Sequence, residues 1–212
     1  MEKIIIVGGG GHCKVIIDII RLGKEYEIWG IIDNIGNQIM GVPVIGKDED
    51  LKRIFLSGVT NAAIGIGGLN NPSLRWRIYK ELKCIGFKLP VLIHPKACVS
   101  DYSKISEGTC IMAGAKINPA VQMGKINIIN TGAIVEHDCC IGDNAHISPG
   151  AVVCGGCTIG GNAQVGANSV VIQGISIKEN SIIGAGSVVT RDIEENSIAY
   201  GNPAKVTRKN FI

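Results

Sequence analysis

Two hydrophobic patterns divide this chain of 212 residues. In the N-terminal segment, short aliphatic runs alternate with stretches in which apolar residues recur every three or four positions; in the C-terminal segment, a single aliphatic residue recurs every six positions. The first pattern predicts strands at 3–7, 28–32, 62–66 and 88–92 and helices at 13–22, 48–56 and 71–85. Strands and helices in alternation are typical of a small parallel α/β sheet.

The second pattern begins at Val99 and never changes phase. Of sixteen successive positions, fifteen are Ile or Val and one is Met: Val99, Ile105, Ile111, Ile117, Met123, Ile129, Val135, Ile141, Ile147, Val153, Ile159, Val165, Val171, Ile177, Ile183 and Val189. The residue two places earlier is usually small, and the residue one place later is often Gly. This hexapeptide repeat predicts a parallel β-helix, in which each aliphatic side chain fills the interior and successive coils stack.

Composition places the boundary between the two segments. The chain is 46% hydrophobic but only 4% aromatic, and between Ala97 and Val189 the only aromatic residue is Tyr102. Pro95 favours an extended conformation at His94, which suits a junction. We therefore expect an α/β, Rossmann-like domain at 1–94 and an all-β domain of hexapeptide coils with a C-terminal tail at 95–212.

The overall charge and hydropathy exclude several functions. The net charge of +3 is too small to indicate binding to nucleic acid or to a membrane surface. No run of about 18 apolar residues predicts a membrane span, and the N-terminal apolar run is too short for a signal peptide. We expect a cytoplasmic protein.

Three segments carry a resemblance to a known family. They are residues 135–139, which read Val-Glu-His-Asp-Cys, residues 184–193, which close the repeat, and residues 201–205, which read Gly-Asn-Pro-Ala-Lys. With the hexapeptide repeat and the α/β domain, the chain resembles the sialic-acid O-acetyltransferase-like proteins, including the UDP-4-amino-sugar N-acetyltransferases of bacillosamine-type pathways. The resemblance implies a left-handed β-helix with three repeats per coil, a homotrimer, and acetyl-CoA as co-substrate.

The candidate catalytic residues are His137 and Asp138. Counted from Val135, they occupy the turn of the repeat, where side chains point away from the core. An adjacent carboxylate orients an imidazole and raises its basicity. The resemblance implies that His137 is the general base, that Asp138 increases its basicity, and that the acceptor is the amine of a nucleotide-linked amino sugar, which attacks acetyl-CoA directly in a ternary complex.

A second group of residues is expected to bind acetyl-CoA. His146 lies nine residues after His137, which is half of an 18-residue coil, so the two histidines share a site only if two subunits contribute to it. The resemblance implies that Asn130 and His146 line the acetyl-CoA pocket and that Gly155, Ala167 and Ala185 lend their backbone to the pantetheine arm. Alternatively, these three small residues only fill corners of the coil.

The glycine run Gly8–Gly11 follows a predicted strand and opens a predicted helix, where backbone N–H groups bind phosphate. The dinucleotide fingerprint fails because Cys13 occupies its third glycine position, so NAD is not expected. The resemblance instead implies binding of a nucleotide-sugar by six residues: Gly10, Gly11, His12, Asp33, Asn34 and Gly67. Alternatively, the glycines only allow close packing of strand and helix.

The cysteines raise the possibility of a zinc site, because Cys139 and Cys140 precede Cys154-x-x-Cys157. The register argues against it, since Cys139 and Cys157 occupy inward positions and Cys154 an outward one. We expect no metal. A zinc-dependent hydratase would need a third histidine on the coils. Two other functions stay open: a sialic-acid-type sugar O-acetyltransferase with the same machinery, and a non-catalytic sugar-nucleotide-binding scaffold.

Overall fold

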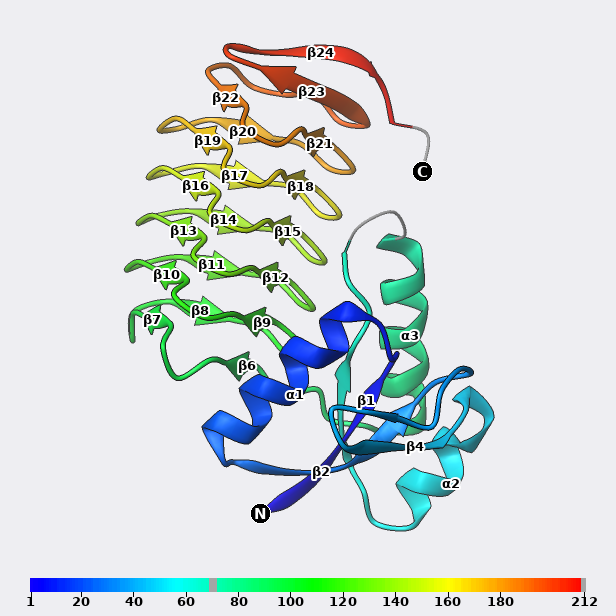
Figure 1. Cartoon of the computed structure of the whole chain (residues 1–212). Coiled ribbons are helices and arrows are strands. Elements are labelled where there is room, and N and C mark those ends of the chain that lie inside the picture. The colour runs from blue at the N-terminus through cyan, green and yellow to red at the C-terminus, as the bar shows by residue number, and fades with distance from the viewer. Residues whose placement is uncertain (69–71, 211–212) are drawn as a thin grey trace. The chain divides into compact units, whose positions relative to one another are not determined.

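The computed structural model describes residues 1–68 and 72–210. The chain divides into two compact units, Met1–Pro95 and Lys96–Ile212, and each is considered by itself (Figure 1). No helix within the described residues has the length and hydropathy that crossing a membrane requires.

The first unit is a five-stranded α/β sheet with the strand order β3-β4-β2-β1-β5. All strands are parallel except β3, which forms a hairpin with β4. The elements are β1 (Glu2–Val7), α1 (Gly11–Gly23), β2 (Tyr26–Ile32), β3 (Gln38–Ile39), β4 (Val42–Gly46), a short 3₁₀ helix η1 (Asp48–Asp50), α2 (Leu51–Leu56), β5 (Asn61–Ile64) and α3 (Pro72–Ile85). The aliphatic run of β1 is buried on both faces, as a central parallel strand requires.

Two details of the first unit differ from the prediction. The expected strand at 88–92 is wrong: Lys88 makes only an isolated bridge to Asn61, and the strand β6 is the short segment Leu92–Ile93. Pro90 interrupts this run because proline has no N–H to donate. Conversely, the pattern does not predict β4, because Pro43 weakens its strand character, although β4 lies directly beside β2. The expected start of the last helix at Asn71 lies outside the described residues.

The second unit is a stack of hexapeptide coils, as predicted. Its first sheet contains β7 (Cys98–Val99), β10 (Lys116–Ile117), β13 (Ile134–Val135), β16 (Val152–Val153), β19 (Val170–Val171) and β22 (Val188–Val189). The second contains β8 (Lys104–Ile105), β11 (Gln122–Met123), β14 (Cys140–Ile141), β17 (Thr158–Ile159) and β20 (Ser176–Ile177). The third contains β9 (Cys110–Ile111), β12 (Ile128–Ile129), β15 (His146–Ile147), β18 (Gln164–Val165), β21 (Ile182–Ile183) and the closing hairpin of β23 (Ser197–Gly201) and β24 (Ala204–Lys209).

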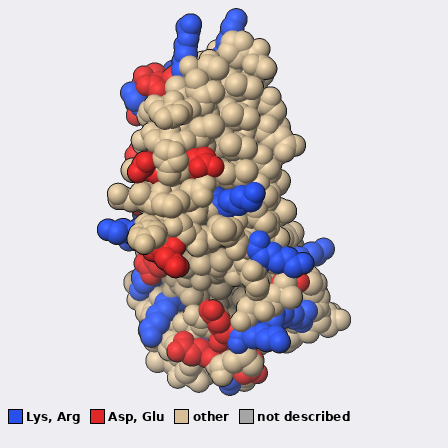
Figure 2. All heavy atoms as spheres, turned by 90° about the vertical axis from the view of Figure 1, so that its left-hand side faces the viewer, with Lys and Arg blue, Asp and Glu red and all other residues tan. Residues whose placement is uncertain are grey.

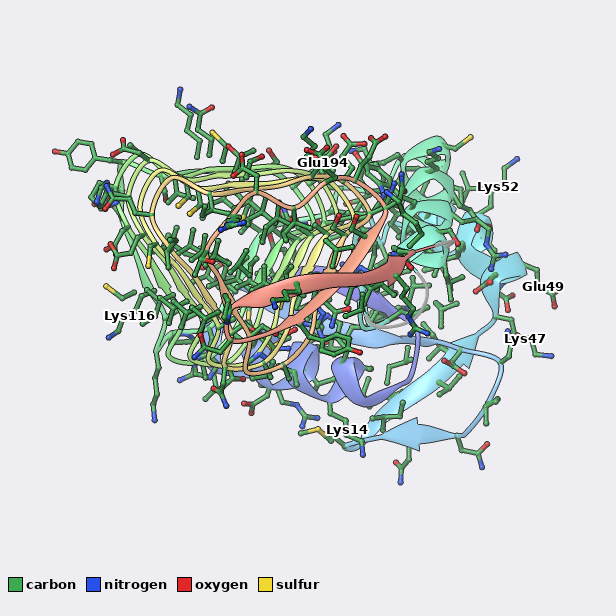
Figure 3. The ribbon with its side chains drawn as sticks, turned by 90° about the horizontal axis from the view of Figure 1, so that it is seen from above. Lys14, Lys47, Glu49, Lys52, Lys116 and Glu194 are labelled. Atoms are coloured by element: carbon green, nitrogen blue, oxygen red, sulfur yellow. The ribbon has the colours of Figure 1, made fainter. Side chains whose placement is uncertain are left out.

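The pairing register confirms that three repeats make one coil. Val135 pairs with Val153, and Val153 pairs with Val171, so each strand lies on the strand 18 residues further along the chain. Seen along the stack, the coils superpose, and side chains such as Lys116 and Glu194 point outwards (Figure 3).

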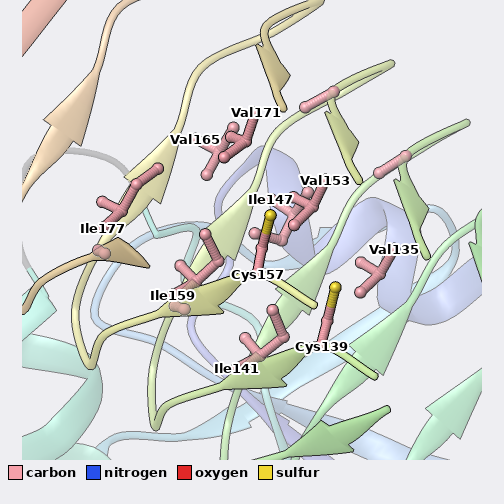
Figure 4. Packing of buried hydrophobic residues seen from close by; sticks show 14 of the residues in the cluster. Val135, Cys139, Ile141, Ile147, Val153, Cys157, Ile159, Val165, Val171 and Ile177 are labelled. Atoms are coloured by element: carbon pink, nitrogen blue, oxygen red, sulfur yellow. The ribbon is translucent and has the colours of Figure 1, made fainter. Parts of the chain in front are cut away.

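The interior of the coils consists of stacked aliphatic side chains (Figure 4). Val135, Val153 and Val171 are each fully buried, as are Cys139 and Cys157, which confirms the inward register predicted for these two cysteines. Between the three short strands of a coil there is room for Ile, Val and small residues, and this explains why the second unit contains so few aromatic residues.

One corner of the stack carries a ladder of asparagines. Asn144, Asn162, Asn180 and Asn196 all have a left-handed backbone, with φ between 54° and 57°. The side-chain amide of each donates to the amide oxygen of the next, over 2.9, 3.0 and 3.1 Å. Asparagine tolerates the left-handed conformation better than most residues do, and its side-chain amide hydrogen-bonds to the asparagine in the neighbouring coil.

Candidate active site

The turn that joins β13 to β14 presents His137 and Asp138 outside the coil. Asp138 has a left-handed backbone, with φ of 59°. Its Oδ2 lies 2.7 Å from Nδ1 of His137. The two side chains are 56% and 66% exposed, so both can be reached by a substrate. The sequence therefore predicted their outward position correctly.

The carboxylate of Asp138 raises the basicity of the His137 imidazole. Its hydrogen bond to Nδ1 is the main cause that raises the pKa of His137 above its ordinary value. Desolvation, the next largest cause, lowers this pKa, and the charges of Asp138 and Glu136 raise it by smaller amounts. Because Nδ1 donates to the carboxylate, Nε2 is the nitrogen that can accept a proton. The pair has the arrangement of a general base and the group that orients it.

Gly155 lies one coil beyond His137, on the same corner between the first and second sheets. Gly155 is buried under the imidazole. Among the residues that the structure describes, its N–H has no hydrogen-bond acceptor.

Asn130 and His146 form a second cluster. Asn130 follows β12 and His146 begins β15, so both belong to the third sheet. The side-chain amide of Asn130 lies 3.1 Å from Nε2 of His146, which is only 6% exposed. Ala167 and Ala185 each lie two residues beyond a strand of this sheet, at the corner between the third and first sheets. The structure thus groups Asn130, His146 and the two alanines away from the corner that carries His137 and Gly155.

The glycine loop of the first unit is held by Asp33. Oδ2 of Asp33 accepts a hydrogen bond of 2.5 Å from the N–H of Gly9, and Oδ1 accepts one of 2.8 Å from the N–H of Ile35. Among the residues that the structure describes, none caps the start of helix α1 at Gly11 with a side chain, and apart from the adjoining backbone none has an atom within 4 Å of where a Cβ of Gly10 or Gly11 would be. The N-terminus of α1 is therefore open to an anion such as a phosphate.

A cavity of about 170 Å³ lies at the carboxyl edge of the same sheet. Its lining is mixed: apolar residues form part of the walls, and four polar side chains also line it: Asp33, Asn34, Asp48 and Arg77. Asp48 and Arg77 are not among the predicted residues; Asp48 closely follows the strand β4, which the pattern does not reveal. His12 and Gly67 are also brought together, since a Cβ on Gly67 would lie 3.8 Å from that of His12. The loop, Asn34 and the cavity therefore form one continuous candidate site in the first unit.

No group of three or more His, Cys, Asp or Glu side chains within residues 1–68 and 72–210 could hold a metal ion. Cys139 and Cys157 are buried in the core, and Cys154 is half-buried.

Both units of the chain resemble known protein families. The family model of the PglD N-terminal domain matches residues 3–82, and that of the bacterial transferase hexapeptide (six repeats) matches residues 156–191. A UDP-N-acetylbacillosamine N-acetyltransferase of Bacillus subtilis is 36% identical over 122 residues, which are 53% of this chain and 52% of that protein. The match therefore spans about half the length of this curated relative.

Two solved structures match almost the whole chain. Perosamine N-acetyltransferase from Caulobacter crescentus, as a histidine variant in complex with CoA and GDP-perosamine, is 36% identical, with a TM-score of 0.94, and the match covers 99% of this chain and 98% of that one. The acetyltransferase domain of PglB from Neisseria gonorrhoeae, in complex with acetyl coenzyme A, is 33% identical, with a TM-score of 0.91, and the match covers 97% of this chain and 99% of that one.

The left-handed stack of hexapeptide coils, with its outward imidazole–carboxylate pair, defines the class of hexapeptide-repeat acyltransferases. Within that class, the chain belongs to the family of nucleotide-sugar N-acetyltransferases, which carry a PglD-type domain before the β-helix and use acetyl-CoA as co-substrate.

Proposed function

We propose that the protein transfers the acetyl group of acetyl-CoA to the amine of a nucleotide-linked 4-amino sugar, with His137 as the general base. The observation that carries the proposal is the bond of 2.7 Å between Nδ1 of His137 and Asp138, because it leaves Nε2 of this exposed imidazole as the nitrogen that can take a proton. An amine is largely protonated at neutral pH and attacks only after losing a proton, so a base with a pKa near the working pH suits this reaction.

The reaction is a direct transfer. The neutral amine, whose ammonium proton has already passed to solvent, forms a bond to the thioester carbon while Nε2 of His137 removes one of the two remaining protons from the nitrogen. The carbonyl oxygen becomes an oxyanion, for which the N–H of Gly155, without an acceptor among the described residues, is a candidate donor. Collapse of the intermediate breaks the carbon–sulfur bond, and the proton held by His137 passes to the departing thiolate. The products are the acetamido sugar and CoA, and no covalent intermediate on the protein is needed.

The complete site is formed between two copies of the chain in a homotrimer. Two observations support this arrangement. The first is that His137 and Gly155 lie on one corner of the coil, whereas Asn130, His146, Ala167 and Ala185 lie on the third sheet and the next corner. A neighbouring copy can bring the second group to the first.

The second observation is an apolar column on the outer face of the first sheet. Ile134, Val152, Val170 and Val188 are in register and only half-buried in a single chain. Figure 2, which looks at the side of Figure 1 where the first sheet lies, shows a broad uncharged area over the coils. Exposed apolar surface of this kind is typical of subunit interfaces. In the trimer, the pantetheine arm would run between the corner with Gly155 and the neighbouring copy's corner with Ala167 and Ala185.

The first unit binds the nucleotide-sugar. The open N-terminus of α1 at Gly10 and Gly11 receives the diphosphate, and Asp33 keeps the loop in shape through the N–H of Gly9. The cavity beside Asn34, which combines apolar walls with polar side chains, receives the base. His12 and Gly67 line the same loop. Since nucleotide-sugars and acetyl-CoA are cytoplasmic metabolites, we place the protein in the cytoplasm, with no nucleic-acid or membrane partner.

The proposal is tested by incubating the purified protein with acetyl-CoA and UDP-, GDP- and dTDP-linked 4-amino sugars, beside CMP-sialic acid. Release of CoA and a product heavier by one acetyl group are expected with an amino sugar. Acetylation of a hydroxyl of CMP-sialic acid would instead indicate the O-acetyltransferase. Binding of the nucleotide without any release of CoA would indicate the scaffold.

A further inference from the structure

The imidazole of His137 lies directly on Gly155. A Cβ built on Gly155 would be 2.7 Å from both Cε1 and Nε2 of His137 and 3.3 Å from Nδ1. These ring atoms are the three nearest neighbours of that position. Contacts under 3.0 Å are far shorter than van der Waals distance, so the ring and a methyl group cannot both occupy this space.

The backbone at this position does not itself demand glycine. On this corner, Pro119 and His137 hold the same place in the two preceding turns and Gln173 holds it in the following one, and all three carry side chains. The left-handed residue of the turn is the next one, Gly156, with φ of 68°, whereas Gly155 itself is not left-handed. A side chain at position 155 is therefore excluded by the imidazole and not by the fold.

We propose that Gly155 is a positioning residue for the reaction: its bare backbone forms the seat on which the imidazole of His137 lies. This inference rests on the proposed function, in which His137 is the base. Lying against the coil, the ring keeps Nδ1 at Asp138 and directs Nε2 towards the acceptor amine. Any side chain at position 155 tilts the ring off the coil and lengthens the bond to Asp138. This role is separate from any contact that the backbone of Gly155 makes with the co-substrate.

The contact between His137 and Gly155 is tested first by a double-mutant cycle of thermal unfolding, which does not depend on activity. Gly155→Ala is introduced into the natural protein and into a His137→Ala background, and the unfolding midpoint is measured for all four proteins. We expect Gly155→Ala to lower the midpoint by about 2–4 °C when His137 is present and to leave it unchanged when His137 is absent. An equal loss in both backgrounds would overturn the inference.

Gly161→Ala is the matched control. Gly161 holds the same place in the neighbouring turn, immediately before the left-handed Asn162, and its Cβ would meet only the backbone oxygen of Asp143 at 3.3 Å and the nitrogen of Asp143 at 3.9 Å. The effect of this substitution should be the same with and without His137.

The second test is kinetic. For Gly155→Ala we expect kcat to fall by about 100-fold, because a displacement of about 1 Å costs this much. The acidic limb of the pH–rate profile should move to lower pH, because the bond that raises the pKa of His137 is weakened. A higher KM for acetyl-CoA with kcat and the acidic limb unchanged would show that Gly155 serves only the co-substrate, and would overturn the inference. Absence of acetyl transfer in the natural protein would instead contradict the proposed function and leave the thermal cycle interpretable.

Discussion

Asp138 accepts a hydrogen bond from Nδ1 of the residue that precedes it, His137, over 2.7 Å. Two successive side chains on an extended backbone would point to opposite sides. Here the left-handed conformation of Asp138 turns its carboxylate towards the imidazole. The geometry of the hexapeptide turn thus creates the pair.

The pH dependence of the reaction follows from this pair. The bond to Asp138 raises the pKa of His137, and a general base works only when neutral, so activity should fall as the pH drops through that raised pKa. Asp138→Asn keeps a residue suited to the left-handed backbone but removes the charge. We expect the acidic limb to move to lower pH and kcat to fall by about 10-fold or more. The ¹H resonance of Cε1 of His137 in a pH titration checks the shift, and an unchanged pKa would contradict the assignment to Asp138.

The proposed placement of the site between subunits predicts that two inactive variants complement each other. His137→Ala and His146→Ala each damage a different half of every site. When equal amounts of the two variants are unfolded together and reassembled, about a quarter of all sites should regain both histidines, because in the proposed site they come from two chains. Activity at low acetyl-CoA should therefore rise above that of either variant alone. Each variant reassembled by itself is the control, and no gain on mixing would mean that one chain supplies both histidines.

The proposed binding of the nucleotide at the glycine loop predicts that a change at Asp33 weakens nucleotide binding selectively. Asp33→Ala removes the acceptor for the N–H groups of Gly9 and Ile35, and bonds to a charged group are worth about 1.5–3 kcal/mol. We expect the nucleoside diphosphate to bind about 10-fold or more weakly by calorimetry, with KM for acetyl-CoA unchanged. Asp18→Ala, on an exposed position of α1, is the control. Equal affinity in the two variants would show that Asp33 does not maintain the loop.

The asparagine ladder predicts a difference between two substitutions at one site. Asn162→Gly removes the amide bonds to Asn144 and Asn180 but permits the left-handed backbone, so it should cost about 1–2 kcal/mol of the free energy of unfolding. Asn162→Ala removes the same bonds and keeps a Cβ in the left-handed conformation without the polar side chain that makes it tolerable, so it should cost about 1–2 kcal/mol more than Asn162→Gly. Denaturant unfolding of both variants measures the difference. Equal losses would show that backbone strain is not what selects asparagine here.

The sequence predicted the β-helix far better than the details of the α/β unit. Every coil repeats one requirement, an aliphatic residue facing the interior, so sixteen positions support the same register. A single proline or glycine therefore does not change the prediction. In the first unit each strand occurs once, without a repeat to support it. Pro43 alone was enough for β4 not to be predicted. The apolar run around Pro90 led to the prediction of a strand that the chain does not form.

The candidate site shows a similar division. The outward position of His137 follows from its place in the repeat, because the repeat dictates which way each side chain points. The contact between His137 and Gly155 joins residues 18 apart and depends on the tilt of a ring, which no local pattern encodes. Asp48 and Arg77 reach the cavity from separate elements, and only the packing of η1 and α3 against the sheet brings them there.

The central claim is that the exposed imidazole of His137 removes the proton from the acceptor amine. The most direct measurement is kcat of His137→Asn with acetyl-CoA and the amino-sugar substrate at saturation, alongside the mass of the assembly. General-base catalysis contributes about 10²–10⁴ in rate, so we predict a fall of that size in kcat, with the trimer and the affinity for the nucleotide-sugar retained. Turnover equal to that of the natural protein would contradict the account.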